Sequence, residues 1–393
     1  MKINNSIAFL PALIAIVFLG LSAFMIYIDF SDTGKQIKSD LHWLRLRDPA
    51  TARSIISSIT AGIISLAVFS FTMVMIMLNQ AASQMSNRIL DKLIGNTFQQ
   101  VVLGIYIGTI VYSLFLLSTI RDIDDGIYVP ALSTYLLIAL TIVDIFLFIY
   151  FLHYITQSVK YEVIIHRIYK QTKKELEKTC RLSTEQEEEK AISGSPIPCP
   201  ATGIFTGYNR KALLQLTEEN NFILSFTHPI GTFILKGNPV VIVSAVDSQS
   251  KIKEDILPHI IIDNEDSIDH NFVYGFKQLT EVAVRALSPG MNDPGTAVVS
   301  VRALSDLLAY RSKHFPDLTI KDKHNIVRII TKEKSFEELF TAALFPIWDY
   351  GKNDRLIQHE MQHVLEQLMM CNSFTTMKKL YNNVQLQMEK AVL

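Results

Sequence analysis

Four long apolar segments in the first 152 residues restrict what this chain can fold into. A helix of about 20 apolar residues crosses roughly 30 Å of hydrocarbon. The four segments reach this length and cover residues 7–28, 55–78, 101–120 and 128–152. The first three contain no charged residue, and the fourth contains only Asp144. We therefore expect a membrane protein with four transmembrane helices in residues 1–152.

The composition narrows the class of protein further. The chain has 393 residues, of which 49% are hydrophobic, and a net charge of -1, so we expect the lipid bilayer and not nucleic acid as a partner. Its three cysteines, Cys180, Cys199 and Cys371, have no metal-type spacing and no disulfide framework. The first apolar segment is longer than a signal-peptide core, which favours a retained anchor. We assign no cofactor and no metal.

Basic residues near the spans indicate the orientation of the chain. The positive-inside rule compares lysine and arginine on the two sides of the membrane. Five basic residues lie in the first loop. On the other side are Lys2, Arg88 and Lys92 and a basic run after the fourth span that includes Lys160, Arg167 and Lys170, so the comparison is nearly balanced. We favour an orientation with both termini on the cytosolic side of the membrane.

Beyond the membrane segments, the pattern predicts an α+β domain. Residues 153–199 are expected to form a helical stalk followed by an acidic and proline-rich linker. Residues 200–270 are expected to form a β-rich subdomain that is barrel-like or hairpin-rich, and residues 271–393 a mainly helical one. Alternating apolar residues predict strands, and apolar residues three or four apart predict helices. Strands are expected at 203–208, 221–227, 259–262 and 326–330, a β hairpin at 228–243, and helices at 272–287, 294–308, 336–349, 354–370 and 375–389.

The stretch from residue 285 to residue 297 predicts a sharp corner between two of these helices. Ser288, Pro289 and Gly290 end the first helix, and Pro294 suits the first position of the next. Asn292 or Asp293 stands where a capping acceptor belongs. The residues expected to form the corner are Arg285, Ser288, Asn292, Asp293 and Thr296.

This stretch, Arg-Ala-Leu-Ser-Pro-Gly-Met-Asn-Asp-Pro-Gly-Thr-Ala, resembles the signature of a family of bacterial predicted inner-membrane proteins that share a domain of unknown function. The resemblance implies the membrane location and the architecture, and it implies no activity. Family members usually carry an arginine-rich stretch where this chain has the acidic residues 263–270. The similarity extends in the same order to residues 81–88, 207–208, 229–234 and 343–348.

The corner has a functional and a structural interpretation. The amino end of the second helix, with Arg285 nearby, is a potential anion site. Alternatively, Asp293 or Asn292 occupies the free backbone N–H groups, and Arg285 pairs with Asp293 to fix the geometry. The pattern favours the structural interpretation.

Asp144 is the second candidate, because an ionisable residue in the hydrocarbon usually faces a bundle interior or a water-filled path. Its expected partners are hydroxyl groups, since the apolar segments contain no lysine or arginine. It belongs either to a pathway or proton relay, or to a structural hydrogen-bonded pair. The candidate pathway residues are Asp144, Tyr106, Ser58 and Ser65, and the further hydroxyls considered are Thr109, Tyr112 and Thr72.

Small residues on two of the spans suit close helix packing. Gly104 and Gly108 form a Gly-x-x-x-Gly pair in the third span. The second span places small residues along one face, and packing is favoured over a pore lining for both. That face contains Ser54, Ser58, Ala61, Gly62, Ser65 and Thr72.

The pattern His359-Glu360-Met361-Gln362-His363 matches the zinc-peptidase motif His-Glu-x-x-His. Short patterns of this kind often arise by chance, and no typical third ligand follows. We assign no catalytic residue and keep a zinc peptidase as a minor alternative. The favoured function is a homo-oligomeric channel or transporter for a small ion or solute, in which the cytosolic domain gates or assembles the complex. The alternative is a membrane-anchored sensor or scaffold.

Overall fold

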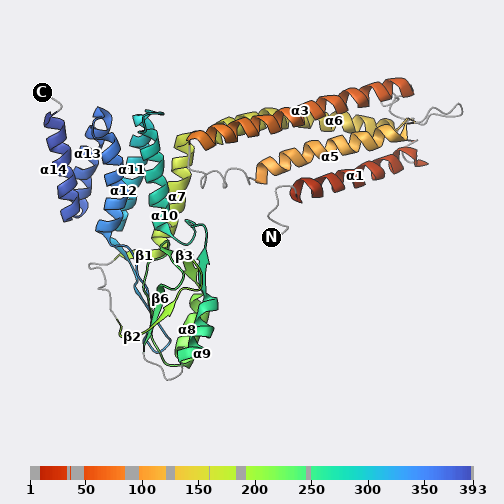
Figure 1. Cartoon of the computed structure of the whole chain (residues 1–393). Helices are drawn as coiled ribbons and strands as arrows, with labels where there is room; N and C mark the ends of the chain where they lie inside the picture. Colours follow the sequence, from red (N-terminus) through yellow and green to blue (C-terminus); the bar gives the residue numbers. More distant parts are fainter. Residues whose placement is uncertain are drawn as a thin grey trace. The chain divides into compact units, whose positions relative to one another are not determined.

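The computed structural model describes residues 9–32, 36, 48–84, 97–120, 129–158, 160–182, 192–244 and 249–390. The chain divides into two compact units, Met1–Lys160 and Tyr161–Leu393. The first unit contains four long helices (Figure 1). All four are long and apolar enough to cross a membrane, which confirms the predicted four-helix membrane part. They are α1 (Phe9–Phe30), α3 (Pro49–Gln84), α5 (Thr97–Thr119) and α6 (Ala131–Ser158).

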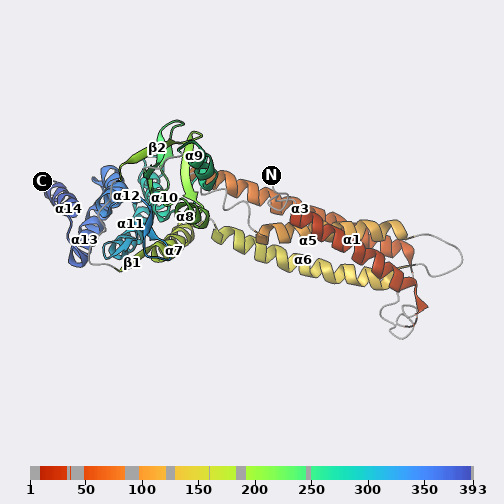
Figure 2. The same ribbon diagram turned by 90° about the horizontal axis from the view of Figure 1, so that it is seen from below.

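Helix α5 packs against the other three helices of the first unit (Figure 2). Its two glycines allow α1 to approach closely. A Cβ atom at Gly104 would lie 2.6 Å from the side chain of Ile14, and one at Gly108 would lie 2.7 Å from the ring of Phe18. Both distances are shorter than atomic contact permits, so the Gly-x-x-x-Gly pair serves helix packing.

The second unit has a helical layer and a sheet layer. The helices are α7 (Tyr161–Thr179), α10 (Phe272–Ala286), α11 (Pro294–Arg311), α12 (Phe336–Gly351), α13 (Arg355–Cys371) and α14 (Thr375–Lys390). Helix α10 is buried along most of its length and contacts α7, α11 and α12. Gly275 of α10 lies directly against Thr172 of α7, where a Cβ atom would collide with the threonine hydroxyl.

The sheet layer contains a five-stranded sheet of order β2-β6-β4-β10-β9 and a three-stranded sheet of order β5-β3-β7. Strand β10 runs parallel to β4, and the other pairs are antiparallel. The strands are β2 (Gly194–Pro198), β3 (Gly203–Tyr208), β4 (Leu224–Phe226), β5 (Phe233–Ile234), β6 (Pro239–Ser244), β7 (Ile260–Asp263), β9 (Thr319–Lys321) and β10 (Val327–Ile330).

Smaller elements complete the second unit and connect its layers. Strand β1 (Cys180–Leu182) follows α7 and pairs with β8 (His314–Pro316), which joins the two layers. Helices α8 (Arg210–Glu219) and α9 (Gln249–Ile256) and the short 3-10 helix η3 (Leu257–His259) lie beside the sheets. Aromatic and aliphatic side chains from both sheets and from α8 form one core, which includes Phe205, Leu213 and Phe226. The α+β fold class is therefore confirmed.

Two details of the predicted β-rich part are wrong. The proline-rich residues 194–198, expected in a linker, form β2, which pairs with β6. This strand tolerates Pro196 and Pro198 because it lies at the edge of its sheet. The expected hairpin at 228–243 is absent, since β5 pairs with β3 and β6 pairs with β4 and β2. The chain turns at Gly237, which has a left-handed φ of 92°, and enters the other sheet.

The segment predicted as a stalk also differs from expectation. Helix α6 ends at Ser158, and α7 begins at Tyr161 as part of the second unit. The apolar face of α7, which includes Ile164, Ile165 and Ile168, is buried, and the helix packs on α10 and α11. Strands β8 and β9 lie in the mainly helical region and were not predicted, whereas β10 coincides with the strand expected at 326–330. The predicted acidic run at 185–189 and the second half of the family-like element at 81–88 lie outside the described residues.

Candidate functional site

Asp144 lies at the centre of the α6 span and is fully buried. Its two carboxylate oxygens accept no hydrogen bond from the described part of the chain. Thr109 of α5 is its nearest hydroxyl neighbour, but that hydroxyl donates to the Ile105 carbonyl at 3.1 Å. A buried carboxylate without a partner is costly in hydrocarbon. Asp144 is therefore available for a proton or a cation.

Two further hydroxyls extend this polar cluster. Tyr106, one turn before Thr109 on α5, lies within electrostatic range of Asp144 and beside Ser70 of α3. Both hydroxyls are buried, and neither has a hydrogen bond of normal geometry among the described residues. Tyr106 and Thr109 are among the partners that the sequence predicted for Asp144. Ser70 was not predicted, because it is one of several hydroxyls in an apolar helix and has no local distinguishing feature.

The buried polar residues continue along α5 toward the start of α6. The Tyr112 hydroxyl donates to the carbonyl of Ser133 at 3.0 Å. The Ser133 hydroxyl and backbone N–H donate to the Asp29 carboxylate of α1 at 2.5 and 2.7 Å. Next to Tyr112, Ser113 accepts a hydrogen bond from the Thr60 hydroxyl at 2.9 Å. Polar groups thus occur at successive turns of α5 in the bundle interior.

At the other end of the cluster, a cavity of about 200 Å³ lies between α3 and α5. Ser70 and Tyr106 form its polar part, and Gln99 and Gln100 line it at the first turn of α5. The rest of its wall is apolar. Because the first turn of α5 is one end of a candidate span, the cavity leads from the cluster around Asp144 toward that end.

The other two predicted pathway residues are not part of this cluster. Ser58 and Ser65 are exposed on α3 of the isolated chain, as is Thr72. The hydroxyls of Ser65 and Thr72 donate to carbonyls of their own helix at 2.9 and 2.8 Å. The bundle therefore brings Asp144, Thr109 and Tyr106 together and places Ser58 and Ser65 on its outer surface.

The predicted corner lies between α10 and α11. Asp293 is the capping residue, and its carboxylate accepts hydrogen bonds from the backbone N–H and the hydroxyl of Thr296 at 3.1 and 2.5 Å. Asn292 has a left-handed φ of 46°, and its backbone N–H donates to the Ser288 carbonyl at 3.0 Å. The Ser288 hydroxyl donates to the Arg285 carbonyl at 2.6 Å. The Asp293 side chain thus occupies the end of α11 where an anion would bind.

Arg285 does not pair with Asp293 as one interpretation of the sequence expected. Its guanidinium forms no ion pair with any residue that the structure describes. It lies near Tyr161, the first residue of the second unit, whose hydroxyl contacts the sulfur of Met291 at 3.6 Å. The corner therefore contacts the beginning of α7.

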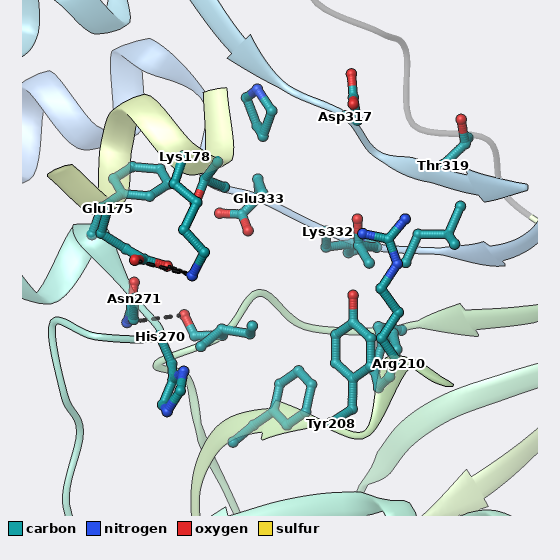
Figure 3. A pocket seen from close by; sticks show the side chains of 18 of the residues that line it. Glu175, Lys178, Tyr208, Arg210, His270, Asn271, Asp317, Thr319, Lys332 and Glu333 are labelled. Carbon is teal, nitrogen blue, oxygen red and sulfur yellow. Dashed lines mark hydrogen bonds and ion pairs between the residues drawn. The ribbon is translucent and has the colours of Figure 1, made fainter. Parts of the chain in front are cut away.

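A second cavity, of about 300 Å³, lies in the second unit between the helical and sheet layers (Figure 3). Charged, histidine and aromatic side chains line it. They come from segments far apart in the sequence, so no local sequence pattern predicted the cavity. Its charged residues include Glu175, Lys178, Arg210 and Glu333. Burial raises the pKa of Glu333 to about 7, although the Arg311 and Lys334 side chains oppose this shift.

The histidine pattern on α13 does not form a metal site. His359 and His363 are exposed, and Glu360 is bound at 2.7 and 2.8 Å by the guanidinium of Arg302. The His363 ring contacts the Gln367 amide at 2.8 Å. Within the described ranges, no group of three or more metal-binding side chains is present.

Comparison with known proteins identifies the family. A family model described as "Predicted membrane protein (DUF2254)" matches residues 4–367. Uncharacterized proteins of Mycobacterium bovis and Mycobacterium tuberculosis are 24% identical over 322 residues, which are 79% of this chain and 62% of each relative. The chain therefore spans less than two thirds of the length of these relatives. No solved structure matches the chain significantly.

Proposed function

We propose that this chain, which belongs to the predicted membrane protein family DUF2254, carries protons through the interior of its four-helix unit. Asp144 is the residue that takes up and releases the proton. The observation that carries this proposal is a fully buried carboxylate at the centre of a span, with no hydrogen-bond partner among the described residues. Intramembrane carboxylates in such positions are typical of proton relays and ion pathways.

The row of hydroxyl groups on α5 supports a proton as the transported species. Thr109 and Tyr106 lie beside Asp144 on one side, and Tyr112 continues the row toward Ser133 and Asp29. Residues one turn apart on a helix rise by about 5 Å, a gap that a single water molecule bridges. Hydroxyls and water pass protons by exchanging hydrogen bonds, whereas a metal cation needs several oxygen ligands at once.

The cavity beside Ser70 and Tyr106 supports a route between this row and the end of the span. Its wall includes Gln99 and Gln100 at the first turn of α5, and at the opposite end of the bundle Asp29 holds the first turn of α6. The polar residues therefore extend over most of the length of α5. The route lies within one chain, so the expected homo-oligomer remains a separate prediction.

We place the four spans in a bacterial inner membrane and the second unit in the cytosol. The basic residues after the fourth span support this orientation, and the matched relatives are bacterial. In this arrangement the second unit is free to bind cytosolic molecules and to regulate the spans.

Reconstituted protein tests the proposal. The full-length chain is reconstituted in liposomes that contain a pH-sensitive dye, and a potassium gradient with valinomycin supplies the driving force. The pH of the lumen should change faster than in empty liposomes, in the direction that the gradient sets. Asp144→Asn keeps the size of the side chain but removes its titration, and we expect it to reduce proton flux by on the order of tenfold or more. Ser65→Ala, on the outer surface of α3, is the matched control and should leave the flux unchanged.

A further inference from the structure

The cavity of the second unit has charged residues on several of its walls (Figure 3). Glu175 and Lys178 come from the last turns of α7, and Arg210 from the first turn of α8. Arg181 belongs to β1, and Glu333 follows β10. These residues are close only because the helical and sheet layers meet here.

Most of these charges neutralise one another. Lys178 pairs with Glu175 at 3.1 Å, and Arg181 pairs with Asp317 at 3.5 Å. Two charges of opposite sign remain without an ion pair in the described part of the chain, namely Arg210 and Glu333. They also do not pair with each other. Arg210 and Glu333 are thus available to a ligand, and Lys332 also lines the cavity.

The surrounding structure fixes the position of Glu333. Arg311, which is fully buried, donates to the backbone carbonyl of the next residue, Lys334, at 3.2 Å and to that of His314 at 3.1 Å. Removal from water raises the pKa of Glu333 even though the charges of Arg311 and Lys334 oppose this shift, so its ionised form lacks sufficient stabilising contacts. A positively charged group of a ligand would supply them.

The wall beside Arg210 contains a second hydrogen-bonding group. The ring of Tyr208 packs against Phe226 with ring centres 4.5 Å apart, and Phe226 packs against Phe205 at 5.1 Å. Burial raises the pKa of Tyr208 to about 12, which keeps its hydroxyl protonated at neutral pH. In Figure 3 this hydroxyl and the Arg210 guanidinium lie on the same side of the cavity. Both groups donate hydrogen bonds and suit a carboxylate.

We propose that this cavity binds a small zwitterion of the α-amino-acid type, with the ligand carboxylate at Arg210 and Tyr208 and its ammonium group at Glu333. The volume supports a ligand of this size. Pockets for small molecules cover roughly 300–1,000 Å³, and a cavity of about 300 Å³ is at the lower limit of this range. A ligand with only a carboxylate would neutralise only Arg210, and a ligand with only an amine would neutralise only Glu333.

Thermal unfolding of the full-length protein in detergent, with single compounds added, tests this inference. The probes are the twenty proteinogenic amino acids, with acetate, methylamine and inorganic phosphate as comparisons. We expect at least one amino acid to raise the unfolding temperature in a saturable way, and the three comparison compounds to have no such effect. If no amino acid does so, or if acetate or phosphate does so equally well, the cavity is not a zwitterion site.

Variants identify the two contacts. Arg210→Gln and Glu333→Gln should each weaken binding of the active amino acid by on the order of tenfold or more, since each loses one charge-assisted contact. Lys211→Gln, on the neighbouring exposed residue of α8, and Glu265→Gln, on an exposed loop residue, are the matched controls and should bind as the parent does. Circular dichroism establishes that each variant is folded. Unchanged affinity in either cavity variant would overturn the assignment.

The dependence of binding on pH provides an independent readout. Because only ionised Glu333 holds an ammonium group, the dissociation constant should rise by about tenfold per pH unit below the pKa of Glu333. Glu333→Gln should abolish this dependence. Besides Arg210, other titratable or charged groups near the cavity are His228, His270, Lys178, Arg181, Lys332, Lys334, Arg311, Glu175, Asp317, Cys180 and Tyr208. His270→Gln should therefore retain the pH dependence, and its loss in that variant would contradict the role of Glu333.

Discussion

Two buried aspartates in the first unit differ in what surrounds their carboxylates. Asp29 accepts hydrogen bonds from the backbone of Leu132 and from the backbone and hydroxyl of Ser133, so it caps the first turn of α6. Asp144 accepts none from the residues described. Asp144 was predictable as a candidate because it is the only charge in its apolar segment. The capping role of Asp29 was not, because its partners lie far away in the sequence.

Glu333 leads to a prediction about stability. Its pKa in the folded protein, about 7, is above its ordinary value of 4.5. The folded state therefore holds the proton more tightly than the unfolded state does. The resulting stability is fully present below pH 4.5 and is lost as the pH rises through 7. Glu333→Gln should remove this dependence, and at pH 8 it should unfold with a free energy about 1–2 kcal/mol greater than that of the parent.

Tryptophan fluorescence measures this effect. Trp348 is buried in α12, and the only other tryptophan of the chain is Trp43, so a Trp43→Phe background makes the signal specific for the second unit. Urea unfolding at pH 5 and pH 8 should give a much larger difference between variant and parent at the higher pH. Equal stabilities at both pH values would show that Glu333 is not destabilised by burial.

Helices were predicted more successfully than strands, because the pattern of a helix lies within one segment whereas a strand also depends on its partner. The helices at 272–286, 294–311 and 336–351 were anticipated because apolar spacing and capping residues lie within each segment. Strand β2 was missed because its prolines are typical of a loop, and only its partner β6 makes it a strand. The partners of β5 and β6 were wrong for the same reason, since strand pairing is not encoded locally.

The corner between α10 and α11 gives a second prediction about stability. Asp293→Ala removes the acceptor for the backbone N–H and hydroxyl of Thr296. We expect a loss of about 1 kcal/mol in the free energy of unfolding, as is usual for capping residues. The Trp348 signal reports this loss. Asp293→Asn, which keeps one acceptor oxygen, should recover most of it.

A double-mutant cycle with Arg285→Ala tests the geometry of the corner. Since Arg285 and Asp293 form no ion pair, the two substitutions should have additive effects within about 0.5 kcal/mol. A coupling energy above 1 kcal/mol would show that the two side chains interact in solution, in conflict with the structure.

At the scale of the whole molecule, the chain has two units with chemically different sites. The first unit has a buried carboxylate with hydroxyl neighbours, and the second has a charged cavity. The first site was partly predictable, because an ionisable residue in an apolar helix stands out. The second was not, since Glu175, Arg210 and Glu333 are ordinary surface-type residues until the layers meet around them.

The orientation of the chain is testable with its natural cysteines. Cys371 is exposed, whereas Cys180 and Cys199 are buried. If the second unit is cytosolic, a membrane-impermeant maleimide should label Cys371 only after the cells are permeabilised. Asp124→Cys, between the third and fourth spans, should be labelled in intact cells in a Cys371→Ser background. Labelling of Cys371 in intact cells would reverse the proposed orientation.

Proton transfer through Asp144 within a single four-helix unit is tested by the initial rate of proton flux into liposomes that contain equal amounts of parent, Asp144→Asn or Ser65→Ala protein. We expect flux for the parent and for Ser65→Ala and a loss on the order of tenfold or more for Asp144→Asn. Equal flux for the parent and Asp144→Asn, or no flux above empty liposomes for the parent, would contradict this expectation.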